Sequence, residues 1–304
     1  MNPIFIGHFF AFITTAIWGV TFVSSKILLD HYSPMSIMLL RFSIAYCALW
    51  MVYPKFHPIS LKTWKKEIVY ICGGLTGVVG YFYCENLSLV YTSASNAGLI
   101  LASVPILVPL VSQIFLKEEK LTSRLILGFF IASIGIALVI FNGQIHLHVN
   151  PIGDFLALLA GVIWACYSMA IKKMDHSLSS LFVTRRTFFY GILFGTILVF
   201  SLEGGIPLTP LYETHALWHL LFLGLVASAA CYVMWAVAIT RISAVKTTNY
   251  LYLMPIFTML ASAWVLHEEI THLMILGCVI ILLGTYVSTR GLPFTTRGKK
   301  IAQS

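Results

Sequence analysis

The chain has 304 residues, of which 59% are hydrophobic and only 10% are charged, and its net charge is +8. A typical soluble domain carries about 25% charged residues, so this composition excludes a soluble globular protein. The basic excess suggests a nucleic-acid or anionic partner, but the positions of the basic residues along the chain argue against that interpretation.

Ten apolar stretches account for nearly the whole chain. A helix needs roughly 20 mostly apolar residues to cross a hydrocarbon core, and most of these stretches approach that length. The connections are short, so no segment remains for a soluble domain. The predicted helices cover residues 4–28, 34–53, 67–90, 93–115, 125–141, 152–171, 180–202, 216–239, 244–266 and 273–289.

The first stretch and the distribution of basic residues together indicate how the chain is oriented in the membrane. No Lys or Arg precedes it, and it is longer than the apolar region of a signal peptide, so we expect a retained helix. With a cytoplasmic N-terminus, most of the 19 Lys and Arg residues fall on the inner side, and the outer connections hold none. This bias follows the positive-inside rule and places both termini, with the basic tail 291–304, in the cytoplasm. The charge thus indicates topology and contact with lipid headgroups, not nucleic acid.

The third stretch contains an ionisable residue, Glu85, beside Asn86. Ionisable groups inside a membrane are costly and are functional candidates by default. Glu85 is therefore expected to bind a cationic group of a substrate, or to carry a proton that is coupled to transport. The structural alternative is that it neutralises Lys26 or Arg41.

Two neighbouring stripes run along the same stretch. Small residues at helical spacing favour close helix packing, and the next stripe is where a cavity wall would lie. The small stripe is Gly73, Gly77, Gly80 and Cys84, and the polar one is Tyr81, Glu85 and Ser88.

Two tryptophans, Trp18 and Trp164, lie near the middle of their stretches, although interfacial Trp residues occur at helix ends. They either line a cavity or pack the two halves of the chain together. Aromatic walls suit apolar, aromatic or cationic solutes. The predicted aromatic chamber also includes Tyr81, Tyr83, Tyr167, Tyr232, Trp235, Tyr250 and Tyr252.

The fourth and ninth stretches offer Asn96 and Asn249 as hydrogen-bonding groups for a substrate or for helix association. Tyr250 lies on one face with Lys246, which can also extend to the headgroups, as can Arg185 and Arg186. One proline in each stretch, Pro105 and Pro255, is expected to bend its helix near the middle.

The sequence predicts no cofactor and no metal site. All 6 cysteines fall inside apolar stretches without CxxC spacing, so they are expected to be small buried hydrophobes. His267 and His272 are five residues apart, whereas a zinc HExxH motif needs two histidines four apart. No P-loop is present, so direct ATP coupling has no support.

The chain repeats itself in order. "AIWGVTFVSSK" at 16–26 corresponds to "VIWACYSMAIK" at 162–172, and Arg41-Phe42 corresponds approximately to Arg186-Thr187. Each unit holds five helices, and five is odd, so the second copy must cross the membrane in the opposite sense. The units, 1–145 and 150–290, therefore form an inverted repeat, an arrangement of many secondary transporters whose substrate site lies near the midplane.

Several of the repeated motifs resemble the EamA-like branch of the drug/metabolite transporter superfamily, from about residue 5 to 290. The resemblance implies a ten-helix carrier that moves amino acids or small metabolites, commonly outward and without ATP. The motifs are Trp18 and Trp164, Ser93-Ala94 and Ser243-Ala244, Pro105 and Pro255, Glu119-Lys120-Leu121-Thr122 and Glu268-Glu269-Ile270-Thr271, and Gly128 and Gly277.

We therefore expect an all-α membrane protein with ten transmembrane helices in two inverted five-helix repeats. The expected function is export of an amino acid or related small metabolite across the inner membrane by alternating access. Its partners would be the solute, the lipid bilayer and, in one variant, protons; the sequence is compatible with a monomer and does not define the oligomeric state. The alternative is a proton-coupled importer or exchanger of cationic or aromatic compounds. An intramembrane enzyme or a sensor would instead need a fixed polar site and no solute movement.

Overall fold

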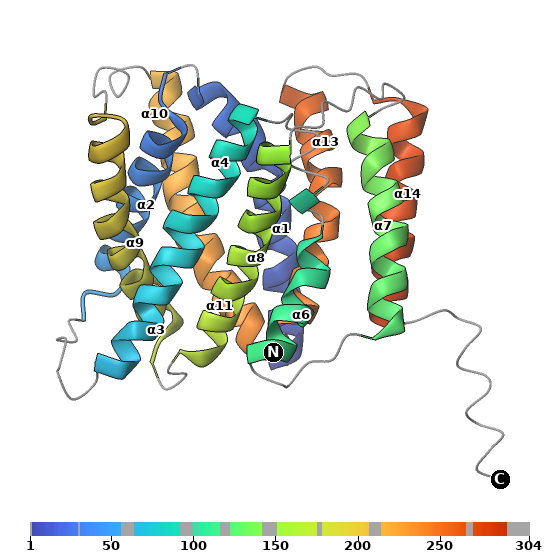
Figure 1. Cartoon of the computed structure of the whole chain (residues 1–304), viewed down its shortest axis with the longest axis horizontal. Coiled ribbons are helices and arrows are strands. Elements are labelled where there is room, and N and C mark those ends of the chain that lie inside the picture. Colours follow the sequence, from blue (N-terminus) through green and yellow to red (C-terminus); the bar gives the residue numbers. More distant parts are fainter. Residues whose placement is uncertain are drawn as a thin grey trace, which may run out of the picture.

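The computed structural model of the chain is helical throughout its described part, which confirms the all-α class (Figure 1). Within the described residues, six helices are long and apolar enough to cross a membrane: Pro3–Ser25, Pro34–Val52, Glu67–Glu85, Pro151–Lys173, Ser180–Leu202 and His215–Ile242. The structure describes residues 2–29, 31–55, 64–91, 100–101, 103–115, 122–141, 151–174, 178–206, 214–265 and 270–290.

In the first half, the predicted helices 4–28, 34–53, 67–90 and 125–141 form with boundaries within a few residues of those expected. Of the predicted helix 93–115, the main described helix covers only Val104–Phe115, and residues 93–99 lie outside the described part. Ser33 begins the second helix by accepting a hydrogen bond from the Ser36 backbone, with Pro34 at its start. The elements are α1 (Pro3–Leu29), α2 (Pro34–Val52), α3 (Trp64–Gly74), η2 (Leu75–Gly80), α4 (Tyr81–Tyr91), α6 (Val104–Phe115) and α7 (Ser123–Phe141).

The second half follows the same pattern. Its elements are α8 (Pro151–Lys173), α9 (Ser180–Leu202), α10 (Thr214–Leu221), η4 (Phe222–Ala230), α11 (Cys231–Ile242), α12 (Ala244–Thr248), η5 (Asn249–Leu253), α13 (Met254–Val265) and α14 (His272–Arg290). One element in each half, η2 in the first and η4 in the second, is π-helical and interrupts an otherwise continuous helix near its centre. Such segments leave backbone groups without regular helical partners and often lie at functional sites.

The expectation that the two repeated prolines bend their helices near the middle is wrong. Pro105 and Pro255 lie in the first turns of α6 and α13, and a short 3₁₀ segment, η5, separates α12 from α13. A proline is tolerated in the first turn because its missing N–H has no intrahelical partner there. In the second half, the proline therefore follows a break in the helix.

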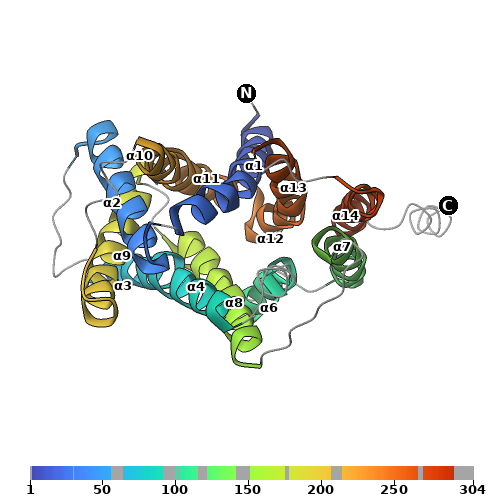
Figure 2. The same ribbon diagram turned by 90° about the horizontal axis from the view of Figure 1, so that it is seen from above.

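Seen from above, the helices form two rows, with α10, α11, α1 and α13 in one and α3, α4, α8 and α6 in the other, and α7 and α14 pair at one edge (Figures 1 and 2). These two helices pack backbone to backbone, since a Cβ on Gly284 would lie 2.4 Å from the backbone nitrogen of Ala132. Gly135 meets the Gly277 carbonyl in the same way. Their outer faces are apolar and exposed, as in Phe130 and Leu283, which suits contact with lipid tails.

Candidate functional site

Aromatic side chains from both halves converge at the centre of the bundle. Trp18 of α1 and Trp164 of α8 meet edge to face, with ring centroids 5.4 Å apart. Trp235 of α11 lies 4.9 Å from Trp18, and Tyr232 lies 5.8 Å from Tyr167. All five of these side chains are buried. We call this group, with Tyr81, Phe42, Phe82 and Phe188, the aromatic cluster.

The cluster contains a buried cation. Arg41 of α2 is 6% exposed, and its Nε donates a hydrogen bond of 2.8 Å to Ser228 Oγ in η4. Its guanidinium also lies 5.2 Å from the ring of Phe82 and 5.5 Å from that of Phe42. The aromatic faces stabilise the charge by cation–π attraction.

A carboxylate lies in the same region. The Tyr81 hydroxyl donates a hydrogen bond of 2.9 Å to Glu85 Oε1, one turn further along α4. Within the described part of the chain, Glu85 forms no ion pair with Arg41, so this form of the structural alternative is not observed. The two charges nevertheless act on each other electrostatically. The side chain of Lys26, the other suggested partner, lies outside the described residues.

Close packing around the cluster depends on glycine. A Cβ on Gly77 would lie 2.3 Å from the ring of Tyr167, and one on Gly73 would meet Met174. The spacing of the small residues predicts close helix packing, and Gly77 packs directly against α8 while Gly73 packs against Met174, just past the end of α8. Ser88 is fully buried on the polar stripe and donates to the Glu85 carbonyl.

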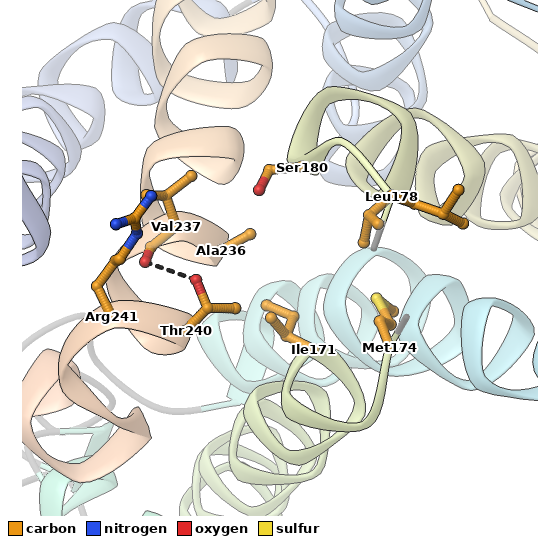
Figure 3. Close-up of a pocket in the computed structure, with 9 residues that line it drawn as sticks. Ile171, Met174, Leu178, Ser180, Ala236, Val237, Thr240 and Arg241 are labelled. Carbon is orange, nitrogen blue, oxygen red and sulfur yellow. Dashed lines mark hydrogen bonds between the residues drawn. The ribbon is translucent and has the colours of Figure 1, made fainter. Parts of the chain in front are cut away.

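The cluster borders a pocket of about 450 Å³, which opens between the end of α8, the start of α9 and the end of α11 (Figure 3). Trp235 directly precedes the pocket residue Ala236, and Tyr167 lies one turn before Ile171. The pocket has apolar and polar lining, and its polar side chains are Ser180, Thr240 and Arg241, of which Thr240 and Arg241 are exposed. Its lining residues are Ile171, Met174, Leu178, Ser180, Val183, Ala236, Val237, Thr240 and Arg241.

The structure brings together most of the site residues that the sequence suggested, and leaves others apart. Tyr250 lies outside the cluster, because its hydroxyl meets His8 Nδ1 at 2.9 Å. Asn249 is 3% exposed, and its Oδ1 has no hydrogen-bond partner in the described part of the chain. Asn86 lies in α4, but its side chain is outside the described residues, as is all of Asn96. The residues that join the cluster are Trp18, Tyr81, Glu85, Trp164, Tyr167, Tyr232 and Trp235.

A second polar group joins α3 to α9. Arg186 donates to both carboxylate oxygens of Glu67, at 2.8 and 3.0 Å, and the Tyr190 hydroxyl donates to Glu67 at 2.8 Å. The neighbouring Arg185 is buried, donates to the carbonyls of Tyr53 and Lys55, and stacks on the Trp50 ring at 4.0 Å. Arg186 therefore ties α9 to α3, and Arg185 ties α9 to the segment that follows α2.

Sequence reasoning missed Ser228, Phe42, Phe82 and Phe188 as members of the cluster. Phenylalanine inside an apolar helix gives no local signal, and Ser228 is an isolated hydroxyl. The sequence repeat offers one indication of the two phenylalanines. Phe42 follows Arg41 and Phe188 follows Thr187, close to the expected correspondence between the second helices of the two units. The two ring centroids are 4.9 Å apart.

Comparisons with known proteins agree with these observations. The sequence profile of the EamA-like transporter family matches residues 5–141 and again residues 151–290. A "Probable amino-acid metabolite efflux pump" of Salmonella typhimurium is 26% identical, over 93% of this chain and 94% of its own. A "Probable terminal-alkyne amino-acid exporter" of Streptantibioticus cattleyicolor is also 26% identical, over 91% of each chain.

Two further matches span the chain equally well. An "Uncharacterized transporter" of Archaeoglobus fulgidus is 25% identical over 93% of this chain and 96% of its own. A solved crystal structure has the same fold, with a TM-score of 0.74 and 18% identity over 93% of this chain and 98% of the other.

Proposed function

The chain belongs to the EamA-like transporter family, and from that premise we propose that it is a secondary carrier for an amino acid or a related small metabolite. The observation that carries this proposal is a buried cation and a carboxylate in one aromatic cluster, each bonded to a neutral hydroxyl instead of to the other. A zwitterion supplies the complementary charges, since its carboxylate can meet Arg41 and its ammonium group Glu85.

The proposed architecture is ten transmembrane helices in two inverted units, 1–145 and 150–290. It is supported by the two separate family matches and by the similar helix-to-helix contacts that equivalent helices of the two units make. α1 packs on α11 and α13, while α8, its proposed equivalent, packs on α4 and α6. α2 packs on η4 and α9 packs on η2, and the two π-helical segments occupy equivalent helices.

Glycine contacts support one register between the two proposed units. A Cβ on Gly224 would lie 2.7 Å from the Cβ of Ile44, and one on Gly74 would lie 3.0 Å from the Cβ of Tyr190. Ile44 thus corresponds to Tyr190, which pairs Arg41 with Thr187 and Phe42 with Phe188. The correspondence of Arg41 with Arg186 inferred from the sequence is therefore shifted by one residue.

We place both termini in the cytoplasm of a cell whose inner membrane holds the protein. α1 begins and α14 ends on the same side of the bundle (Figure 1). Lys172, Lys173 and Arg241, on the pocket side, agree with the positive-inside rule. The pocket then faces the cytoplasm, and Trp18, Trp164, Tyr167, Tyr232 and Trp235 separate it from the outer side.

Export is the proposed direction, and it is supported by two similar proteins, one named a probable terminal-alkyne amino-acid exporter and the other a probable amino-acid metabolite efflux pump. The second candidate is a proton-coupled importer or exchanger of cationic or aromatic compounds. It is favoured by the position of the Glu85 carboxylate, which is hydrogen-bonded to Tyr81 among aromatic rings that attract cations.

Uptake into proteoliposomes tests the proposal. The panel contains radiolabelled amino acids, their deaminated and decarboxylated analogues, and a quaternary-ammonium cation, each with and without an imposed pH gradient. We expect movement of an amino acid and weaker movement of analogues that lack either charge. Movement of the quaternary cation alone, driven by the pH gradient, would support the second candidate, and movement of no compound would overturn the proposed substrate class.

A further inference from the structure

The aromatic cluster departs from the symmetry of the two proposed units at one hydrogen bond. Trp18 Nε1 donates to the carbonyl of Ala227, in η4, at 2.9 Å. The equivalent donor in the other unit is Trp164, and the equivalent acceptor is the carbonyl of Gly77, in η2. This follows because Ser93-Ala94 matches Ser243-Ala244 and Gly74-Leu75 matches Gly224-Leu225, so 150 residues separate equivalent positions there.

The equivalent bond is not formed. The Gly77 carbonyl instead accepts the hydroxyl of Tyr232 at 3.0 Å. Trp164 Nε1 is buried and has no hydrogen-bond partner in the described part of the molecule. A buried N–H without a partner is energetically unfavourable, so some other state of the protein is expected to satisfy it. The residue equivalent to Tyr232 in the first unit is Phe82, which has no hydroxyl. A tyrosine hydroxyl can therefore replace the tryptophan N–H as donor at Gly77 but not at Ala227.

The competing donors lie close to the acceptor. Trp164 lies one helical turn before Tyr167, whose ring packs against Gly77. The ring centroid of Trp164 is 6.2 Å from that of Tyr232. Gly77 belongs to a π-helical segment, where carbonyls are released from regular helical bonding. A small shift of α8 relative to η2 would therefore exchange one donor for the other.

We propose that the Gly77 carbonyl is a shared acceptor for which Tyr232 and Trp164 compete, and that Tyr232 biases the carrier toward the conformation with the pocket open. This inference rests on the proposed inverted repeat, in which the two units exchange conformations between the inward-open and outward-open states. In the exchanged state, Trp164 donates to Gly77 and Trp18 releases Ala227. Tyr232 is thus a positioning residue that sets the conformational equilibrium.

Thiol accessibility without any substrate tests this role. The six native cysteines are replaced by Ala, and single cysteines are introduced at Val237, which lines the pocket, or at Leu87, its equivalent on the other side. Tyr232→Phe removes one hydrogen bond of ordinary strength, so the equilibrium should move about fivefold away from the pocket-open state. Labelling by an impermeant maleimide should then slow at Val237→Cys and accelerate at Leu87→Cys.

The opposite shift is expected for Trp164→Phe, which removes the donor of the other state and retains an aromatic ring. Tyr252→Phe, a buried tyrosine outside the cluster, is the matched control and should leave both labelling rates unchanged. Equal labelling in wild type and Tyr232→Phe, in folded protein, would overturn the inference. Because no solute is involved, a shift in labelling is distinguishable from success or failure of the proposed transport.

Discussion

Replacement of Glu85 by Gln should lower the rate of amino-acid uptake by about tenfold or more. A charged hydrogen bond contributes roughly 1.5–3 kcal/mol, and the substitution removes the charge that we propose binds the ammonium group of the substrate. The fold should persist, because the Tyr81 hydroxyl can donate to the new amide oxygen as it does to Glu85 Oε1. Initial rates in proteoliposomes, over a range of solute concentrations, measure the effect.

The matched control is Glu203→Gln. Glu203 is an exposed acidic residue at the end of α9, which accepts hydrogen bonds from Ser33 and Ser36, and it lies outside the aromatic cluster. Uptake by this variant should stay within about twofold of wild type, the range of a surface effect near 0.5 kcal/mol. If Glu85→Gln also transports at the wild-type rate, Glu85 has a structural role, and the assignment of the ammonium site is wrong.

The largest effect on stability is expected for Arg186→Met. This substitution leaves Glu67 with its charge uncompensated at the junction of α3 and α9, where the two side chains are 13% and 11% exposed. Removal of one partner from a buried ion pair destabilises a protein by about 3–5 kcal/mol. The free energy of unfolding, or the midpoint of thermal unfolding in detergent, should therefore fall steeply.

Two further variants separate the charge from the packing. Arg186→Met combined with Glu67→Leu should be more stable than Arg186→Met alone, because no unpaired charge remains. Tyr190→Phe removes a single neutral donor to Glu67 and should lower the free energy of unfolding by about 1 kcal/mol. An Arg186→Met protein that unfolds like wild type would show that the pair is screened by solvent and adds little stability.

Much of the helical framework follows from the sequence, because hydropathy alone marks where a chain can cross lipid. The predicted third helix, 67–90, corresponds to Trp64–Tyr91, and the eighth, 216–239, to Thr214–Ile242. The π-helical segments inside both helices were not predictable. An extra residue in a turn is stabilised by tertiary contacts, such as the bond from Trp18 to Ala227, and leaves no mark in local composition.

The membership of the site was only partly predictable. Symmetry of the repeated sequence singled out Trp18 and Trp164, which do meet at the centre. Tyr250 shares the aromatic character of the cluster members, but a neighbouring polar group, His8, determines its position. The sequence does not predict the position of Arg41 in the site, since its hydroxyl acceptor, Ser228, is 187 residues away in the chain.

Counterflow is the measurement that tests most directly whether this protein is an alternating-access carrier. Proteoliposomes are preloaded with a high concentration of an unlabelled amino acid from the panel and diluted into a trace of the same labelled compound. The account predicts a transient accumulation of label inside, above its equilibrium level, because each outward step returns the binding site for an inward one. Label that only equilibrates, without exceeding that level, would contradict alternating access.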